Sequence, residues 1–205
     1  MRRYRAILVL MIAAFYWGGD HFAAQSPVRV RVQTEVGDIV VEVDSANAPA
    51  TAANFLRYVH AGHYDGGNWH RTVKLDNQPE SPVKIEVIQA AVNPARAKEG
   101  FPPIPIERTS MTGLLHKDGA ISMARGAPDS ATSGWFICIN DQPSLDFGGA
   151  RNPDGQGFAA FGRVVSGMDV VRKIQAAPSS TTRTSNAEAQ RLTPPIGIIK
   201  AERIK

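Results

Sequence analysis

The sequence is poor in cysteine and contains no long hydrophobic run, and each shortage narrows what the chain can be. Cys138 is the only cysteine among 205 residues, so no disulfide can form within the chain. Because Cys138 lies inside a short apolar run, we interpret it as a small buried side chain rather than a reactive thiol. No apolar stretch reaches the roughly 20 residues that span a bilayer. With 43% hydrophobic residues, the chain is neither disordered nor a polytopic membrane protein.

An excess of one charge is also missing. Lys and Arg number 23 against 19 for Asp and Glu, which gives a net charge of +4 at pH 7. Arg2, Arg3, Arg5 and Asp20 all precede residue 25, so the chain without residues 1–24 carries only +2. A body so nearly balanced gives no reason to expect nucleic acid or an acidic lipid surface as a partner.

Signatures of several enzyme classes are absent as well. The chain has no Gly-x-Ser-x-Gly motif of the kind that carries a hydrolase serine. Its histidines lack a metal-binding spacing such as His-Glu-x-x-His. The glycines of residues 148–149 and 154–157 are not followed by the Lys-Ser/Thr pair of a phosphate-binding loop. A hydrolase, the first alternative function, therefore has little support.

Residues 1–24 have the composition of a targeting segment. A basic start is followed by an apolar run over residues 6–17, which is the length of a signal-peptide hydrophobic region. Cleavage after Ala24 would place Phe22 where a small residue is preferred. The sequence therefore predicts either a signal peptide or an uncleaved N-terminal membrane anchor, followed by an exported domain over residues 25–205 that is periplasmic or secreted.

The rest of the chain consists mainly of short apolar or alternating runs separated by turn residues, a pattern typical of β-strands. We expect strands at residues 28–34, 39–43, 69–73, 83–89, 119–125, 135–139, 157–165 and 196–204. Apolar residues at helical spacing predict helices over residues 48–61 and 167–174. Residues 90–118 are proline-containing and are expected to be an irregular excursion. The fold class is mostly β in a single domain, and pairing of the last strand with the first would close a barrel.

Short motifs occur in order through this domain. They are Tyr64-Asp65-Gly66 with His70-Arg71, Ile88-Gln89, residues 119–124, Phe136-Ile137, Leu145-Asp146, residues 161–164 and Gly167-Met168. Together they resemble the cyclophilin family of peptidyl-prolyl cis-trans isomerases over about residues 28–205. The resemblance implies a closed eight-stranded antiparallel barrel capped by two helices.

The resemblance also implies a site. Arg71 corresponds to the catalytic arginine, and Gln89 to the glutamine that hydrogen-bonds the substrate backbone. Phe136, Leu145 and Phe158 line the proline pocket, with Val87 in place of the usual methionine, while Ala124 and Arg125 lie in the stretch whose backbone holds the peptide.

Several positions depart from the family pattern. They are Glu86 for an aromatic residue, Ala90-Ala91 for a glycine pair, Gly134 for a glutamine, Ser144 for an aromatic residue, Phe158 for a histidine, and an insert at residues 147–157. Because Ser144 removes an aromatic contact, we expect poor binding of cyclosporin-type drugs.

The implied activity is acceleration of rotation about X–Pro peptide bonds during protein folding, with the Arg71 guanidinium weakening amide resonance in the twisted state. Such catalysis requires no metal and no cofactor. The expected partners are proline-containing polypeptides, namely unfolded or folding envelope or secreted proteins. We expect the protein to be a monomer. It would contact a membrane only through residues 1–24, if these are not cleaved. The second alternative is a non-catalytic cyclophilin-like module that binds proline-containing segments.

Overall fold

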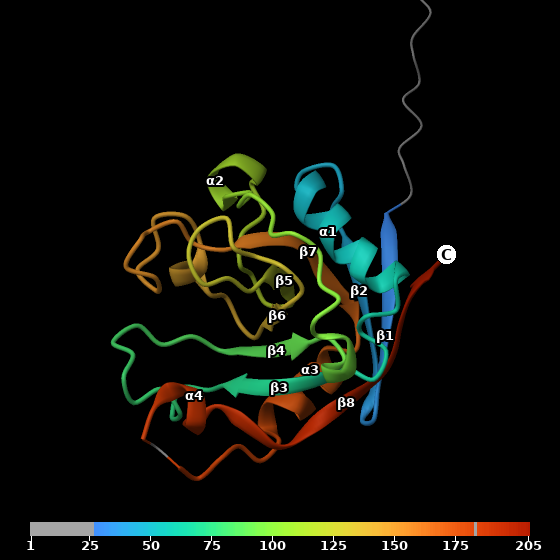
Figure 1. Ribbon diagram of the computed structural model, residues 1–205. Coiled ribbons are helices and arrows are strands. Elements are labelled where there is room, and N and C mark those ends of the chain that lie inside the picture. The colour runs from blue at the N-terminus through green and yellow to red at the C-terminus, as the bar shows by residue number, and fades with distance from the viewer. Residues whose placement is uncertain (1–26, 183) are drawn as a thin grey trace, which may run out of the picture.

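Eight antiparallel strands close into a barrel in the computed structural model, which describes residues 27–182 and 184–205. The strand order around the barrel is β1-β2-β7-β5-β6-β4-β3-β8 (Figure 1). This confirms the predicted barrel. The targeting segment predicted at residues 1–24 lies outside the described residues.

The elements follow the sequence patterns closely in most places. The strands are β1 Val28–Thr34, β2 Gly37–Val43, β3 Asn68–Val73, β4 Val87–Ala91, β5 Ala120–Met123, β6 Trp135–Cys138, β7 Ala159–Ser166 and β8 Arg191–Ile204. The helices are α1 Pro49–His60, α2 Thr109–Thr112, α3 Met168–Ala176 and α4 Asn186–Ala189, with short 3-10 turns η1 Pro94–Arg96 and η2 Pro143–Leu145. Strand β8 pairs with both β1 and β3, which closes the barrel as predicted.

The two longer helices cover the two ends of the barrel (Figure 1). Helix α1 packs against β7 and β8, and α3 packs against β2, β3 and β4. Phe55 of α1 is fully buried among Tyr64, Trp135 and Phe161, with ring centroids 5.6, 5.3 and 5.2 Å away. Burial of this aromatic cluster fills the barrel interior and contributes a large share of the hydrophobic stabilisation.

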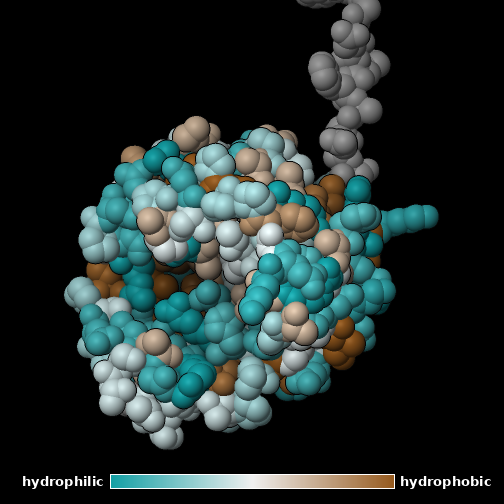
Figure 2. Space-filling model, viewed as in Figure 1, coloured by the Kyte–Doolittle hydropathy of each residue, from teal (hydrophilic) through white to brown (hydrophobic). Residues whose placement is uncertain are grey.

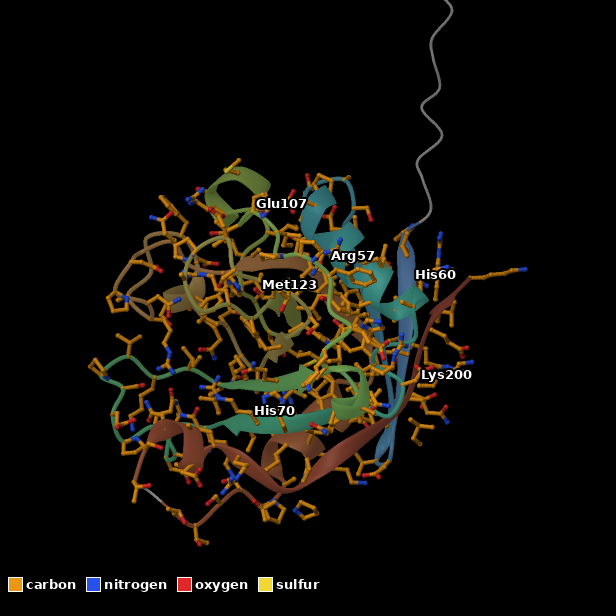
Figure 3. The ribbon with its side chains drawn as sticks, viewed as in Figure 1. Arg57, His60, His70, Glu107, Met123 and Lys200 are labelled. Atoms are coloured by element: carbon orange, nitrogen blue, oxygen red, sulfur yellow. The ribbon has the colours of Figure 1, made fainter. Side chains whose placement is uncertain are left out.

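The start of α1 is stabilised by a residue far away in the sequence. Ala48 occupies the N-cap position and makes no side-chain capping bond. Instead, the Glu107 carboxylate accepts hydrogen bonds from the backbone N–H groups of Ala50 and Thr51, at 3.1 and 2.8 Å. Figure 3 shows Glu107 beside this first turn. The long segment between β4 and β5 therefore caps α1, which brings a negative charge to the positive end of the helix.

Two strand starts were predicted wrongly. Strand β8 begins at Arg191 rather than at residue 196, because its pairing with β3 extends to Arg71 and Arg191. The start of β4 is also displaced. Residues 83–86 are not part of a strand, and β4 begins at Val87 and continues to Ala91. The backbone N–H and C=O of Ile85 bond to the side-chain amide of Gln78, at 3.2 and 2.9 Å, rather than to a neighbouring strand. The apolar side chains in this run are accommodated by a loop that a buried amide holds in place.

Candidate active site

A row of side chains crosses the outer face of the barrel on four neighbouring strands. Arg71 of β3 lies opposite Gln89 of β4, Gln89 lies opposite Phe136 of β6, and Phe136 lies opposite Ser122 of β5. Residues directly opposite each other on paired strands share a face of the sheet. The next residue along β4, Ile88, belongs to the barrel core, because successive side chains on a strand point to opposite faces.

The Arg71 guanidinium is held by two neutral amides. Its Nη1 donates to Gln89 Oε1 at 2.8 Å, and its Nε and Nη2 donate to Gln190 Oε1 at 2.8 and 2.5 Å. Three of the five N–H donors of the guanidinium are thereby used, and two remain. Burial and the positive charge of Arg151 lower the pKa of Arg71 to about 10, so the side chain is charged at neutral pH.

An apolar cluster lies next to this arginine, outside the barrel core. Phe136, Leu145 and Val87 are buried in it, and Phe158 and Ala124 lie partly exposed at its edge. The ring of Phe158 meets the ring of Phe136 edge-on, with centroids 5.4 Å apart. Figure 2 shows a hollow in this face of the molecule, between β4 and the loop that follows η2, with hydrophobic residues at its base. The structure thus brings seven of the eight predicted site residues together by their side chains.

The eighth, Arg125, uses its side chain for another purpose. Its guanidinium donates two hydrogen bonds to Asp154, at 2.8 and 2.9 Å, and a third to the carbonyl of Gly157 at 2.7 Å. It also lies 5.0 Å from the ring of Phe158, and the side chain is only 2% exposed. The Arg125 side chain therefore anchors the insert and holds Phe158, and only its backbone remains for a peptide.

A Ser–His–Asp line lies behind the pocket. His116 Nδ1 is 2.7 Å from Asp146 Oδ1, and His116 Nε2 is 3.0 Å from Ser122 Oγ. This is the connectivity of a hydrolase triad, but Ser122 is 0% and His116 1% exposed, so no substrate reaches the hydroxyl. The His116 ring stacks on Phe136 at 6.0 Å. The line therefore supports the floor of the apolar cluster.

Sequence reasoning missed the residues that lie behind Arg71. Gln190 lies in a stretch without a recognisable pattern, and Asn77, Gln78 and Arg151 lie in loops. Arg151, in the insert, donates to Gln78 Oε1 at 3.0 Å and to the carbonyl of Val83 at 2.5 Å. Polar residues that meet only in the folded chain leave no local signal, so the sequence alone offered no way to find them.

Other features of the surface lie apart from this site. A groove of about 900 Å³ is bordered by β1, β2, β7 and residues 113–118 and contains none of the eight predicted site residues. In residues 27–182 and 184–205, no three His, Cys, Asp or Glu side chains gather as metal ligands would. No helix in the same residues has the length and apolar character needed to cross a membrane.

The closed barrel, with arginine, glutamine and phenylalanine in a row beside an apolar cluster, defines a cyclophilin-like protein. The model of the family "Cyclophilin type peptidyl-prolyl cis-trans isomerase/CLD" matches residues 29–203. The chain therefore belongs to this family of enzymes.

Similar sequences and solved structures support the same family assignment. The chain is 34% identical to peptidyl-prolyl cis-trans isomerase A of Dickeya dadantii, over 97% of this chain and 95% of the relative. It is 35% identical to peptidyl-prolyl cis-trans isomerase B of Escherichia coli, over 71% of this chain and 83% of the relative. A crystal structure of a cyclophilin-type isomerase from Cryptosporidium parvum covers 87% of this chain and 98% of its own, with a TM-score of 0.67 at 20% identity. That likeness shows the fold.

Proposed function

We propose that Arg71 catalyses rotation about X–Pro bonds by donating a hydrogen bond towards the prolyl nitrogen. Amide resonance gives the bond its barrier of about 18–20 kcal/mol, and the nitrogen gains a lone pair as the bond twists. A charged donor binds this twisted state more strongly than either planar state, so it lowers the barrier. The observation that carries the proposal is the position of the Arg71 guanidinium beside the apolar cluster. Three of its N–H groups donate to Gln89 and Gln190, and the other two are available to a substrate.

The pocket would hold the proline ring while the peptide is anchored on one side. Phe136, Leu145, Val87 and Phe158 supply apolar surface for the ring and exclude water. Gln89 accepts from Arg71 through Oε1, and its Nε2 makes no hydrogen bond within the described residues, which leaves a donor for a substrate carbonyl. The backbone of Ala124 and Arg125 would bind the flanking peptide. A crystal structure of the Cryptosporidium parvum relative was determined in the presence of the dipeptide Ala-Pro, which supports a proline-containing substrate here.

A folding role in an exported location is part of the same proposal. Prolyl isomerisation takes tens of seconds or longer without a catalyst and limits the folding of many chains. The basic and apolar composition of residues 1–24 supports export, and the clients would then be envelope or secreted proteins. Fractionation of cells that express the full chain tests the location, and recovery in the cytosolic fraction alone would contradict export.

A binding module without catalysis is the second candidate, favoured by the substitutions Glu86, Gly134 and Ser144 at positions near the pocket. The Glu86 carboxylate bonds to Asn140 and Gln175, at 2.9 and 3.1 Å, so it is already engaged within the protein. A β-carbon at Gly134 would stand 3.6 Å from the Ala124 β-carbon and 3.9 Å from Gln89 Nε2, in ordinary contact with both. None of these three residues bonds to Arg71, whose described partners are Gln89 and Gln190, so we favour the enzyme.

The deciding experiment measures cis/trans exchange of an Ala-Pro peptide by NMR, with the full chain and its Arg71→Ala variant. We expect the variant to lose activity by about 100-fold or more, the usual effect of removing a donor that acts in the transition state. Arg163→Ala removes an exposed arginine from β7 and is the matched control, with unchanged activity. Binding of the peptide without exchange in the unmodified protein would instead establish the binding module.

A further inference from the structure

Gln190 lies directly behind Arg71 and is completely buried. Its Oε1 accepts from both Nε and Nη2 of Arg71, and its own Nε2 donates to the backbone carbonyl of Asn77 at 3.1 Å. Its backbone carbonyl accepts from the N–H of Thr72, at 2.9 Å. The side chain and the backbone of Gln190 are thus both fixed, and both fix the strand that carries Arg71.

Asn77 completes this support. It is completely buried, donates to the carbonyl of Thr72 at 2.9 Å, and accepts from the N–H of Lys74 at 2.7 Å. The loop after β3 therefore folds back on its own strand and presents its carbonyl to Gln190. A buried amide network with all its members hydrogen-bonded is rigid, because releasing one member leaves a polar group unpaired.

The contact with Gln190 determines the orientation of the guanidinium plane. The bond from Nη1 to Gln89 is a single point of attachment about which the group could turn. The paired bonds from Nε and Nη2 to one oxygen are a second attachment on the opposite edge. Together they leave one N–H on Nη1 and one on Nη2 for a substrate, in a fixed direction.

The chemical character of the support matters as much as its geometry. Gln190 and Gln89 are neutral, and no carboxylate among the described residues forms a hydrogen bond or ion pair with Arg71. Arg125, by contrast, is paired with the Asp154 carboxylate. A carboxylate in place of Gln190 would hold the guanidinium equally well but would offset its charge, which is the property that the twisted peptide bond requires.

We propose that Gln190 is a positioning residue for catalysis: it fixes the plane of the Arg71 guanidinium through an uncharged acceptor, so that the charge stays available to the prolyl nitrogen. This inference rests on the proposed role of Arg71. It assigns a function to the stretch between α3 and β8 that is otherwise without a recognisable pattern.

The test compares Gln190→Met, Gln190→Glu and Arg71→Ala in the full chain, by kcat and KM for an Ala-Pro peptide and by the NMR signal of the Arg71 Nε–H. We expect Gln190→Met to lower kcat by about 10- to 100-fold with KM nearly unchanged, and to speed solvent exchange of that N–H. We expect Gln190→Glu to keep the N–H protected and still lower kcat. Gln142→Met alters another buried glutamine, whose side-chain amide donates to the carbonyl of Ile139 and not to Gln190 or Arg71. It controls for general destabilisation and keeps its kcat.

The outcomes separate the two proposals. Full activity in Arg71→Ala would refute the proposed function, and this inference with it. Loss of activity in Arg71→Ala, with unchanged kcat in folded Gln190→Met, would refute only the positioning role. If Gln190→Met does not fold, Gln190→Glu provides the test, because its side chain has nearly the same shape as glutamine. An unchanged kcat in Gln190→Glu, with the Arg71 Nε–H still protected from exchange, would refute the requirement for an uncharged acceptor.

Discussion

Arg71 and Arg125 are two partly buried arginines of the predicted site, and their partners give them different roles. Among the residues that the structure describes, the first bonds only to side-chain amide oxygens, whereas the second forms a paired contact with the Asp154 carboxylate and lies over the ring of Phe158. A guanidinium that is already paired with a carboxylate has little charge left for a substrate, but it is well suited to fix a loop. At the scale of the residue, the chemistry of the partner therefore distinguishes the catalytic candidate from the structural arginine.

Ser122 offers a test of whether the Ser–His–Asp line is structural. Replacing Ser122 by Ala should leave His116 Nε2 buried without its partner and lower the free energy of unfolding by about 1–3 kcal/mol. Isomerase activity should persist, since the hydroxyl is completely buried and its contact is with His116. Urea denaturation and peptide exchange measure the two effects.

The matched control is Ser45→Ala, which removes a hydroxyl from an exposed loop residue. It should change neither stability nor activity. An esterase activity in the unmodified protein that disappears in Ser122→Ala would contradict the structural role and would revive the hydrolase alternative.

At the scale of the element, the start of α1 is capped by Glu107, which lies in the segment before β5. Changing Glu107 to Gln removes the charge at the helix start and weakens its bonds to the N–H groups of Ala50 and Thr51. We expect a loss of about 1 kcal/mol in the free energy of unfolding. Glu99→Gln removes a carboxylate whose ion pair with Arg96 is exposed and should cost less than about 0.5 kcal/mol. Equal effects of the two changes in urea denaturation would argue against the cap.

The insert contains a matched pair of glycines that tests its fit against the pocket. Gly155 and Gly157 have nearly the same backbone angle, with φ of +62° and +63°, so an alanine costs about 1–2 kcal/mol of strain at either. At Gly155 no atom of the described part of the chain lies within 4 Å of a new β-carbon, whereas at Gly157 the carbonyl groups of Leu145 and Asp146 would lie within 2.7 Å. We expect Gly157→Ala to destabilise the protein by about 2 kcal/mol more than Gly155→Ala. It should also raise KM, because Leu145 and Phe158 are displaced. Equal stability and KM in the two variants would contradict this arrangement.

The elements that could be predicted are those whose signal is local. Alternation located β1 and β2, and helical spacing located α1 and α3, because burial on one face imposes a period on the sequence. The same alternation gave a wrong start for β4, because residues 83–86 form a loop that Gln78 holds in place, and such a loop can also bury alternate side chains. Glu107 and Gln190 bond to residues far away in the sequence, and no local sequence pattern predicts those contacts.

At the scale of the whole molecule, barrel closure is what assembles the site. Strand β8 begins directly after Gln190 and pairs with β3, opposite Arg71. The row from Arg71 through Gln89 to Phe136 continues this pairing across β4 and β6. The sequence motifs placed these residues on strands, but only the register of a closed barrel aligns them. The predicted roles of the site residues remain predictions until activity is measured.

The stability of the barrel should fall as the pH drops below about 6.5, the pKa of an unperturbed histidine. Burial lowers the pKa of His63, helped by the positive charge of Arg96, and burial lowers the pKa of His70, helped by Arg71. Both histidines therefore stay neutral in the folded chain at a pH where the unfolded chain takes up protons. The folded state then loses free energy relative to the unfolded state until the pH passes below the folded pKa values.

Urea denaturation at pH 7.5 and at pH 5.0 measures this loss as a difference in the free energy of unfolding. His63 stacks on Phe101 with ring centroids 5.4 Å apart, so His63→Phe replaces it with a ring that does not titrate and should reduce the difference between the two pH values. Any packing change in the variant acts equally at both pH values and cancels in that difference. His60→Asn, at the exposed end of α1 (Figure 3), is the control and should keep the full difference.

Carboxylates with lowered pKa values, such as Asp154 beside Arg125, lose their contribution to stability only at more acidic pH. A decline confined to pH values below about 4, near the ordinary pKa of Asp, would therefore assign the effect to them and refute the role of the histidines.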